Sequence, residues 1–472
     1  MGNFWDYSTW GFFNLLAVLL FSLLVANMLK RQIKFLNATL IPTSVLGGGI
    51  LLVATWIYKL ITGRVMFDAA FFGGNGTTNL EVLTYHALAL GFVASTFKAS
   101  KGKMTRQRTT EIFNTGVTTV ATYLIQGVVG MVITIIAGMV LSGFFKAAGI
   151  LLPFGFGQGT GQALNYGGIF EADYGFDGGR SFGLTIAAVG FLSASIGGVI
   201  HLNVLKKRGK VTKTFTEEGA LKSEDIQKSN EIPMQGSLDK MTVQIAIVAS
   251  TYFLAYLMMF GLGELVPGFK SVIYGFNFLL GVLAATLVKA VLRVLNDKQI
   301  IHREYTNSFL MTRISNFFYD LMVVAGVAAI RVDVLEKYWG MILILGAAGL
   351  VVTFAYNRIV AKTLFKDYQE EQFLAMYGML TGTASTGVIL LREIDGDFQT
   401  PAADNLVYQN FPAIVFGFPL MLLATLAPQK PVLTTIILVA FFLVMNVILF
   451  RSKIFRKKKT PEAETEPEAV TQ

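Results

Sequence analysis

Two apolar stretches of this sequence combine closely spaced glycines with hydroxyl side chains. The pattern G-x-x-x-G-T ends at Thr160 within GFGQGTGQAL (155–164) and at Thr383 within YGMLTGTAST (377–386). Each glycine inside a helix costs roughly 1 kcal/mol relative to alanine, because glycine gives up the most backbone entropy. Glycines gathered at this density therefore indicate backbone that leaves the helix and presents amides and carbonyls to a ligand.

The groups freed at such breaks suit two kinds of ligand. Amides at the start of a half-helix carry partial positive charge and suit a carboxylate, whereas freed carbonyls and hydroxyls suit a hard cation such as sodium. We expect sodium at Thr160, Thr383, Ser385 and the neighbouring carbonyls. The candidate substrate and ion ligands in the two stretches are Gly157, Gln158, Gly159, Thr160, Gly161, Thr381, Gly382, Thr383, Ser385 and Thr386.

Helix packing is the main alternative for these glycines, because small-xxx-small patterns bring membrane helices together without any substrate. One isolated G-x-x-x-G would favour packing, but two at matching places, each followed by threonine, favour binding. Nucleotide binding is disfavoured. The spacing of Gly157, Gly159 and Gly161 does not fit the dinucleotide fingerprint, and neither stretch contains the G-K-[ST] of a phosphate loop.

The composition predicts a membrane protein. Of 472 residues, 53% are hydrophobic and only 15% are charged, whereas soluble domains are about 25% charged. The absence of cysteine excludes disulfides and thiolate metal sites, and three histidines leave little material for a metal centre. The net charge of +9 comes from short basic clusters between apolar runs, as in membrane proteins, so we expect no nucleic-acid partner.

Eleven apolar segments are long enough to be considered membrane crossings, for which about 20 residues are needed. We therefore expect an all-α, polytopic fold in a lipid bilayer. The expected crossings are 9–29, 40–61, 82–97, 112–143, 181–203, 241–264, 271–295, 308–330, 338–361, 404–426 and 432–450.

The basic residues predict the orientation of the chain. They concentrate in alternate loops, for example KKRGK at 206–210 and the RKKK run at 456–459. The positive-inside rule then places the N-terminus outside and the C-terminus in the cytoplasm. On this basis 206–240 is a cytoplasmic linker, and 456–472 is a disordered cytoplasmic tail.

The position of the two glycine stretches predicts an internal repeat. Residues 1–205 and 241–427 each contain five crossings and one glycine stretch. Because five is odd, the second half enters the membrane from the opposite face, which gives two inverted-topology repeats. We expect re-entrant glycine-rich loops near 151–168 and 373–391, and the crossing at 432–450 is an extra packing helix.

Polar residues inside crossings are further candidates, because a charge at mid-bilayer costs roughly 2.5–3.5 kcal/mol on insertion scales. Within RISNFFYDLMVVAG, Asn316 and Asp320 share a helix face with Arg313 and are candidates for cation or substrate contact. Arg392 could meet a substrate carboxylate or serve only as a topology charge. Residues expected to form interhelical hydrogen bonds are Gln126, Asn277, Asn357 and Asn410.

Three segments resemble bacterial sodium/glutamate symporters, the glutamate:sodium symporter family. They are IPTSVLGGGIL, PFGFGQGTGQALNYGGIFEADYGF and YGMLTGTASTGVILLREID, and the resemblance extends over about residues 8 to 427. It implies two inverted five-helix repeats with re-entrant loops at 154–165 and 377–390, sodium-coupled glutamate uptake, and a homodimer. Gln158 departs from the Gly-Gly-His-Gly-Thr that is common in the family, and its amide cannot titrate near neutral pH.

The expected function is therefore sodium-coupled symport of glutamate across the bacterial cytoplasmic membrane by alternating access. Sodium is the coupling ion, and no other cofactor and no covalent chemistry are expected. Carriers of the same fold for another dicarboxylate or a 2-hydroxycarboxylate are the closest alternative. An anion-permeable channel and an integral membrane enzyme are more distant ones, and the sequence contains no H-E-x-x-H.

Overall fold

The described part of the chain is helical. The computed structural model describes residues 3–38, 40–98, 105–209, 230–234, 237–267, 270–275, 277–395 and 399–454. Within these ranges the backbone forms helices and one isolated bridge, between Glu231 and Glu304. The predicted tail at 456–472 and most of the predicted linker at 206–240 lie outside the described residues.

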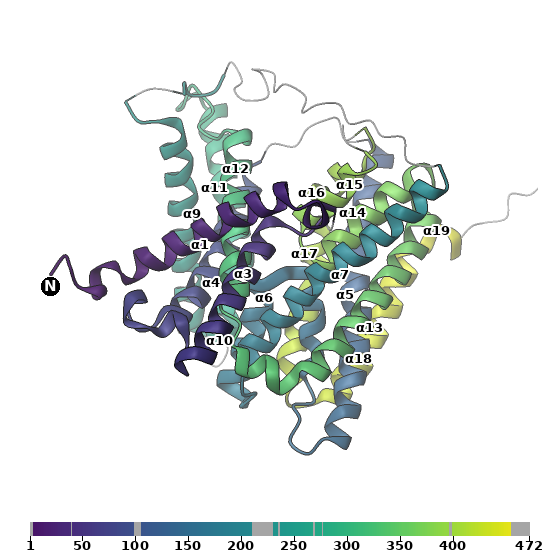
Figure 1. Cartoon of the computed structure of the whole chain (residues 1–472). Coiled ribbons are helices and arrows are strands. Elements are labelled where there is room, and N and C mark those ends of the chain that lie inside the picture. The colour runs from purple at the N-terminus through teal and green to yellow at the C-terminus, as the bar shows by residue number, and fades with distance from the viewer. Residues whose placement is uncertain are drawn as a thin grey trace, which may run out of the picture.

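Eight described helices are long and apolar enough to cross a bilayer, as expected of a polytopic membrane protein (Figure 1). They coincide with eight of the predicted crossings. These helices are α1 (Tyr7–Gln32), α3 (Thr43–Thr62), α5 (Arg106–Val140), α7 (Gly179–Lys207), α9 (Lys240–Leu265), α11 (Asn277–Asp297), α13 (Val332–Leu364) and α18 (Pro431–Leu449).

The other three predicted crossings are also helical, but they are less apolar or shorter. They correspond to α4 (Gly76–Thr96), α12 (Ser308–Ala328), and the pair α16 (Ala402–Tyr408) and α17 (Asn410–Leu426). Polar residues lower the hydropathy of α4 and α12, and the third segment is interrupted at Gln409. Short helices complete the described chain: α2 (Lys34–Ala38), η1 (Met66–Asp68), η2 (Ala70–Phe72), η3 (Ala148–Ile150), α10 (Lys270–Gly275), η5 (Lys366–Tyr368) and α19 (Arg451–Ile454).

Helix lengths repeat along the chain. Helices α1 and α9 both have 26 residues, α3 and α11 have 20 and 21, α4 and α12 both have 21, and α5 and α13 have 35 and 33. Packing follows the same order, since α1 lies against α3 as α9 lies against α11, and α4 lies against α12. The two halves therefore contain matching series of helices.

Helices α5 and α13 cross in an antiparallel sense. The Gln126 amide donates to Thr353 Oγ1 at 2.8 Å, and the Asn357 amide donates to Thr122 Oγ1 at 3.3 Å. A later residue on α5 thus meets an earlier residue on α13. These bonds confirm Gln126 and Asn357 as interhelical hydrogen-bonding residues, and Asn277 joins them by donating to the Tyr85 carbonyl at 2.9 Å.

The first glycine stretch forms a bent helix rather than a loop. Helix α6 (Leu151–Tyr174) is helical except at Gly159, where φ is 78° and ψ is −171°. The chain folds back there, so that the rings of Phe154 and Tyr166 stack with centroids 4.0 Å apart. We call α6 the first hairpin, with arms 151–158 and 160–174.

Several glycines of the first hairpin are helical and allow close helix packing, which was the alternative to ligand binding considered from the sequence. A methyl group at Gly155 would lie 2.7 Å from Ile186 Cγ2, and one at Gly157 would collide with the Tyr123 ring. One at Gly161 would lie 2.9 Å from Leu88. Among these glycines, backbone conformation requires glycine only at Gly159.

The second glycine stretch forms a hairpin of two short helices. Helix α14 (Gln369–Thr381) and helix α15 (Ala384–Arg392) are joined through Gly382 and Thr383. Their backbones touch, because a methyl group at Gly378 would lie 2.8 Å from the Gly387 Cα. We call α14 and α15 the second hairpin.

The two hairpins begin at opposite ends of α13. At the base of the first, Asp177 pairs with Lys337 Nζ at 2.9 Å, near the start of α13. At the base of the second, Glu370 pairs with Arg358 at 2.7 Å, toward its end. At 1.5 Å per residue, about 30 Å of helix separates these anchors. The hairpins thus approach each other along α13 from opposite ends.

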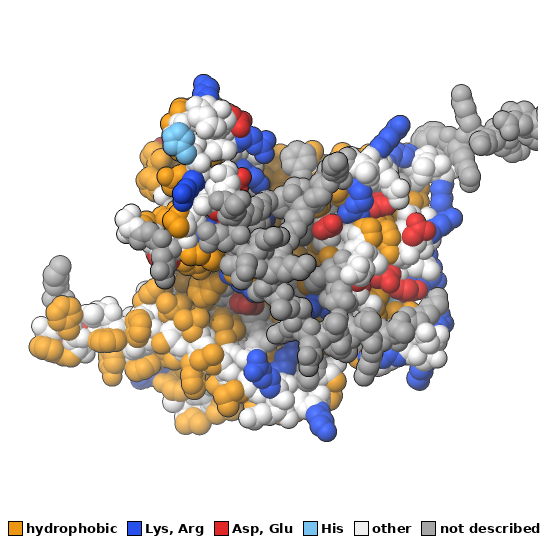
Figure 2. All heavy atoms as spheres, turned by 90° about the horizontal axis from the view of Figure 1, so that it is seen from above, with side chains coloured by type: hydrophobic (Ala, Val, Ile, Leu, Met, Phe, Trp, Pro, Cys, Tyr) orange, Lys and Arg blue, Asp and Glu red, His pale blue; other side chains and the backbone are white. Residues whose placement is uncertain are grey.

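Apolar side chains cover the sides of the molecule, as expected in a bilayer. Helix α1 alone exposes Phe13, Phe21, Leu24 and Met28 to more than half of their area. Hydrophobic atoms predominate at the lower left of Figure 2, on the side of the molecule where α1 lies. Lysine and arginine side chains lie at several places on the end of the molecule that faces the viewer in Figure 2. Helix α18 packs against α5 and also touches α13, where Tyr356 donates to Asn446 at 2.9 Å.

Candidate functional site

The two backbone breaks lie against each other. A methyl group at Gly159 would lie 3.4 Å from Thr383 Cγ2 and 3.8 Å from the Gly382 carbonyl oxygen. Residues more than 200 positions apart in the chain are therefore neighbours at the tips of the hairpins. The structure brings together the two places that the sequence singled out.

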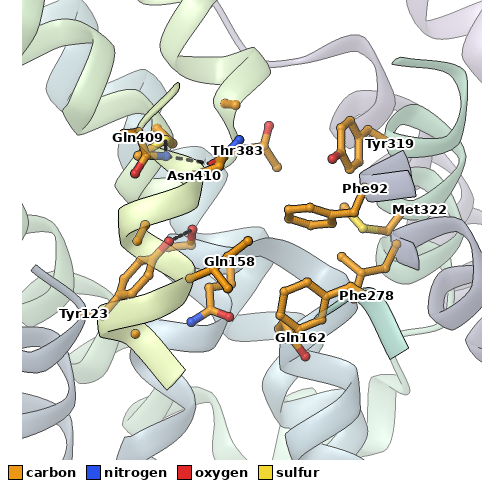
Figure 3. Close-up of a pocket in the computed structure, with 18 of the residues that line it drawn as sticks. Phe92, Tyr123, Gln158, Gln162, Phe278, Tyr319, Met322, Thr383, Gln409 and Asn410 are labelled. Atoms are coloured by element: carbon orange, nitrogen blue, oxygen red, sulfur yellow. Dashed lines mark hydrogen bonds between the residues drawn. The ribbon is translucent and has the colours of Figure 1, made fainter. Parts of the chain in front are cut away.

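A cavity of about 130 Å³ lies between the tips (Figure 3). Helices α4, α5, α11, α12 and the α16–α17 junction close it on the other sides. Its lining includes Leu88, Phe92, Tyr123, Gly157, Gln158, Gln162, Phe278, Tyr319, Met322, Met379, Gly382, Thr383, Gln409 and Asn410.

The polar groups of this cavity are neutral. They are amides, hydroxyls and backbone groups, and none of the described residues that line it carries a charge. The Gln162 side chain is 1% exposed, and its Nε2 has no hydrogen-bond partner among the described residues. A buried, unpaired amide donor of this kind favours a ligand oxygen in the cavity.

Helix α5 holds the freed carbonyls of both breaks. The Tyr123 hydroxyl donates to the Gly157 carbonyl at 3.0 Å, and Gln126 Nε2 donates to the Leu380 carbonyl at 2.9 Å. Tyr123 and Gln126 are three residues apart and so share one face of the helix. One continuous helix therefore supports both breaks.

The predicted hydroxyl ligands are placed in different ways. Thr160 is buried and donates to the Met322 carbonyl at 3.3 Å, while Thr381 donates to the carbonyl four residues before it. Thr383 lines the cavity and lies 3.4 Å from the Thr386 hydroxyl. The side chain of Ser385 lies outside the described part of the structure, so sodium at Thr160, Thr383 and Ser385 stays a prediction.

Of the predicted substrate and ion ligands, Gly157, Gln158, Gly382 and Thr383 line the cavity, whereas Asn316, Asp320 and Arg392 are among those that do not. On α12 the cavity is lined by Tyr319 and Met322. Asn316 and Asp320 of the same helix are not among its lining residues, and both are exposed. Arg392 is exposed at the far end of α15 from the tip.

Tyr123, Gln162, Tyr319 and Gln409 line the cavity but were not among the predicted ligands. A sequence signal existed for Gln162, which is a second glutamine of the same glycine stretch, although the break at Gly159 places Gln158 and Gln162 on different arms of the first hairpin. Gln409 was missed, although Gln409 and Asn410 interrupt the apolar run at 404–426 and Pro412 follows them, a pattern that indicates a helix boundary. There Gln409 donates to Asn410 at 2.9 Å.

A second, more open cavity of about 440 Å³ adjoins the first. Its lining includes Glu81, Asn165 and Arg180, and Arg180 lies 3.7 Å from Glu81 and 3.5 Å from Glu171. Asn165 Nδ2 donates to the Gly275 carbonyl at 2.6 Å and to Gln162 Oε1 at 3.2 Å. Gln162 and Asn165 therefore separate the two cavities.

The segment GRSFG (179–183) has the G-x-S-x-G spacing of a hydrolase nucleophile turn. Here it forms the first turn of α7, and Ser181 is 1% exposed. Its hydroxyl accepts a hydrogen bond from the Arg331 amide at 3.0 Å. A methyl group at Gly183 would lie 2.3 Å from the Ala163 carbonyl, so this glycine serves packing.

Acidic and histidine side chains do not cluster in the way that metal centres require. Within the described ranges no group of three or more His, Cys, Asp or Glu side chains could hold a metal ion. A cation bound within these ranges would take no more than two ligands from such side chains. Comparison with known proteins adds nothing to this picture, since no family model and no curated protein matches the chain.

Proposed function

We propose that this protein is a secondary active transporter that couples sodium to the movement of glutamate or a similar small organic anion by alternating access. The observation that carries the proposal is the meeting of two broken hairpins at one cavity with an uncharged, amide-rich lining. Discontinuous helices that meet in this way are typical of secondary transporters.

We propose that residues 1–205 and 241–427 are inverted-topology repeats and that the two hairpins are re-entrant. The matching helix lengths, the antiparallel crossing of α5 and α13, and the hairpin anchors at opposite ends of α13 all support this. Irregular backbone at membrane depth is tolerated where protein buries it or where it lines a cavity. Both breaks meet that condition.

The charge balance of the cavity supports an anion together with a cation. Helix α15 begins at Ala384, beside the cavity, and the second arm of the first hairpin begins after Gly159. Both helix starts turn partial positive charge toward the cavity and suit a carboxylate. A bound sodium ion would offset the remaining negative charge of the anion. Binding of sodium would then raise the affinity for the anion, and binding of the anion would raise the affinity for sodium by the same factor.

The uncharged lining also favours a second candidate, a carrier for a dicarboxylate or 2-hydroxycarboxylate. No carboxylate stands among the described lining residues to pair with the ammonium group of glutamate. An anion without an amino group would leave no such charge unpaired. The family resemblance favours glutamate, and the lining favours the amine-free anion.

We further propose that the N-terminus lies outside the cell, that the C-terminus lies in the cytoplasm of a bacterium, and that the protein forms a homodimer. The positive-inside rule supports the orientation. Arg108, at the start of α5, and Arg451, near the end of the described chain, lie at the same end of the molecule, because Arg451 donates to Asn114 of α5 at 3.0 Å.

Uptake into liposomes tests the proposal. We expect labelled glutamate, or one of the competing dicarboxylates, to accumulate under an inward sodium gradient and not under an equal potassium gradient. A sodium ionophore should abolish the accumulation, and protein-free liposomes are the control. Rapid flux that only equilibrates the anion, without sodium, would indicate a channel and overturn the proposal.

A further inference from the structure

The crossing of α5 and α13 is a fully buried cluster of neutral polar groups. Each helix contributes a threonine and an amide four residues apart, Thr122 with Gln126 and Thr353 with Asn357. All four side chains are at most 2% exposed. Each amide donates to the threonine of the other helix, at 2.8 and 3.3 Å, so the arrangement has an approximate twofold symmetry.

This cluster has oxygen atoms without partners. Gln126 Oε1 and Asn357 Oδ1 are buried, and neither accepts a hydrogen bond from the described residues. A buried acceptor that is left unpaired destabilises the folded protein. Two such oxygens on facing helices are costly to retain unless a ligand satisfies them.

The surroundings of the cluster favour a cation. Gln126 Nε2 donates to the Leu380 carbonyl, which lies in the last turn of α14. The carbonyl end of a helix carries partial negative charge and attracts cations. Divalent Ca²⁺ and Mg²⁺ are usually held by carboxylates, whereas this set of oxygens is neutral and suits a single positive charge.

We propose that a sodium ion binds at this crossing, held by the amide oxygens of Gln126 and Asn357. The hydroxyls of Thr122 and Thr353 and the Leu380 carbonyl accept hydrogen bonds from the two amide NH2 groups and so orient the amide oxygens for the ion. The site is distinct from the predicted one at Thr160, Thr383 and Ser385. The direct hydrogen bonds hold the two helices close together, which favours sodium over the larger potassium ion.

The position of this site suggests how the ion would act, and this step rests on the proposed function. Leu380 is three residues before Thr383, which lines the cavity. Gln126 is three residues after Tyr123, which holds the Gly157 carbonyl of the first hairpin. An ion at the crossing would thus fix the tips of both hairpins and prepare the cavity for the anion.

The test is the sodium dependence of thermal unfolding of the full-length protein in detergent, with KCl replacing NaCl at constant ionic strength. Sodium that binds the folded state raises the unfolding temperature. We expect the sodium concentration that gives half of the maximal rise in unfolding temperature to increase at least about tenfold in Thr353→Val and in Asn357→Leu. Loss of even an outer-shell partner of a metal ion typically lowers the affinity for the metal 10–100-fold. Thr353→Ser should restore the response, because it keeps the oxygen.

Thr251→Val is the matched control. Thr251 is also a buried threonine with an unpartnered hydroxyl among the described residues, but it lies on α9, which packs against other helices than α5 and α13. It should respond to sodium as the natural protein does. Equal sodium responses in all variants, or equal effects of sodium and potassium on the natural protein, would overturn the proposal.

Failure of this site and failure of the proposed function give different results. Sodium-dependent uptake that is unchanged in Thr353→Val would reject the crossing site and leave the symporter. A sodium-dependent unfolding temperature that is lost in Thr353→Val, together with no anion uptake, would leave the ion site and reject the symporter.

Discussion

The two hairpins reach the same cavity with different backbone chemistry. Gly159, at the tip of the first, has φ 78° and ψ −171°, a conformation that is essentially restricted to glycine. Gly382, at the tip of the second, has a negative φ of −150°. A methyl group there would instead lie 2.9 Å from Thr386 Oγ1 and 3.0 Å from the Phe191 ring. The first break needs glycine for its conformation, and the second needs it for space.

The bases of the hairpins differ as well. The side chain of Asp177 at the base of the first is 73% exposed and accepts one hydrogen bond, from Lys337, while the Asp177 carbonyl accepts one from the Tyr338 hydroxyl at 3.2 Å. Glu370 at the base of the second is 12% exposed, accepts two bonds of 2.7 Å from Arg358, and lies 2.8 Å from His201 Nε2. The second hairpin is therefore anchored more firmly, and movement of the first is the less restricted of the two.

The largest effect is expected at the second base. Glu370→Gln removes the charge that balances the half-buried Arg358, and breaking a buried pair costs roughly 3 kcal/mol or more. The unfolding temperature of the purified protein should fall sharply. If Glu370→Gln were no less stable than a substitution at the exposed first base, the proposed difference in anchoring would be wrong.

Gly159→Ala should have the next largest effect. A side chain in this conformation costs about 1–3 kcal/mol, and the strain falls at the tip that faces Thr383. We expect uptake to fall by more than tenfold while the protein still inserts into membranes. Gly261→Ala on α9 is the control, because a methyl group at Gly261 would meet nothing within 4 Å.

Gly382→Ala should be milder than Gly159→Ala. The nearest atom to the added methyl is a threonine hydroxyl, which can rotate away, and the Phe191 ring needs to shift by only a few tenths of an ångström. We expect a partial loss of uptake, measured in the same liposomes. If Gly382→Ala lost more uptake than Gly159→Ala, the proposal that only Gly159 is required by its backbone conformation would be wrong.

Tyr123→Phe tests the support that α5 gives to the first tip. It removes the donor to the Gly157 carbonyl, and an unsatisfied buried carbonyl costs about 1–2 kcal/mol. A modest fall in unfolding temperature and slower uptake are expected. Tyr256→Phe, at an exposed ring of α9, should change neither quantity.

Asp177→Asn should have the smallest effect. The hydrogen bond from Lys337 holds the pKa of the Asp177 carboxyl below its ordinary value of 3.8. Stability from a lowered pKa is present above the ordinary value and is lost only as the pH falls through the folded value. Because the pair with Lys337 is exposed, this contribution is small. The variant should therefore unfold only slightly below the natural protein throughout pH 5–8, and the difference should disappear as the pH falls through the folded value. A clear difference in that range would show that the first base is also firmly anchored.

Helix positions were predictable because bilayer crossings need long apolar runs, and every predicted crossing coincides with helix in the structure. The glycine stretches were predictable as special sites, but their form was not. Packing contacts at Gly155, Gly157 and Gly161 keep most of the first stretch helical. The break at Gln409, beside the cavity, was also missed within the predicted crossing at 404–426, although Pro412 indicates a helix boundary there.

The sequence by itself determined the membrane class, the positions of the helices and the two glycine breaks, since these follow from local hydropathy and glycine content. Only the tertiary structure decided which polar residues meet. The direction of a side chain depends on how its helix is rotated and packed, so Asn316 and Asp320 face away while Tyr319 of the same helix lines the cavity. The hydrogen bond from Gln126 to Thr353 likewise forms only because α5 and α13 cross at these two residues.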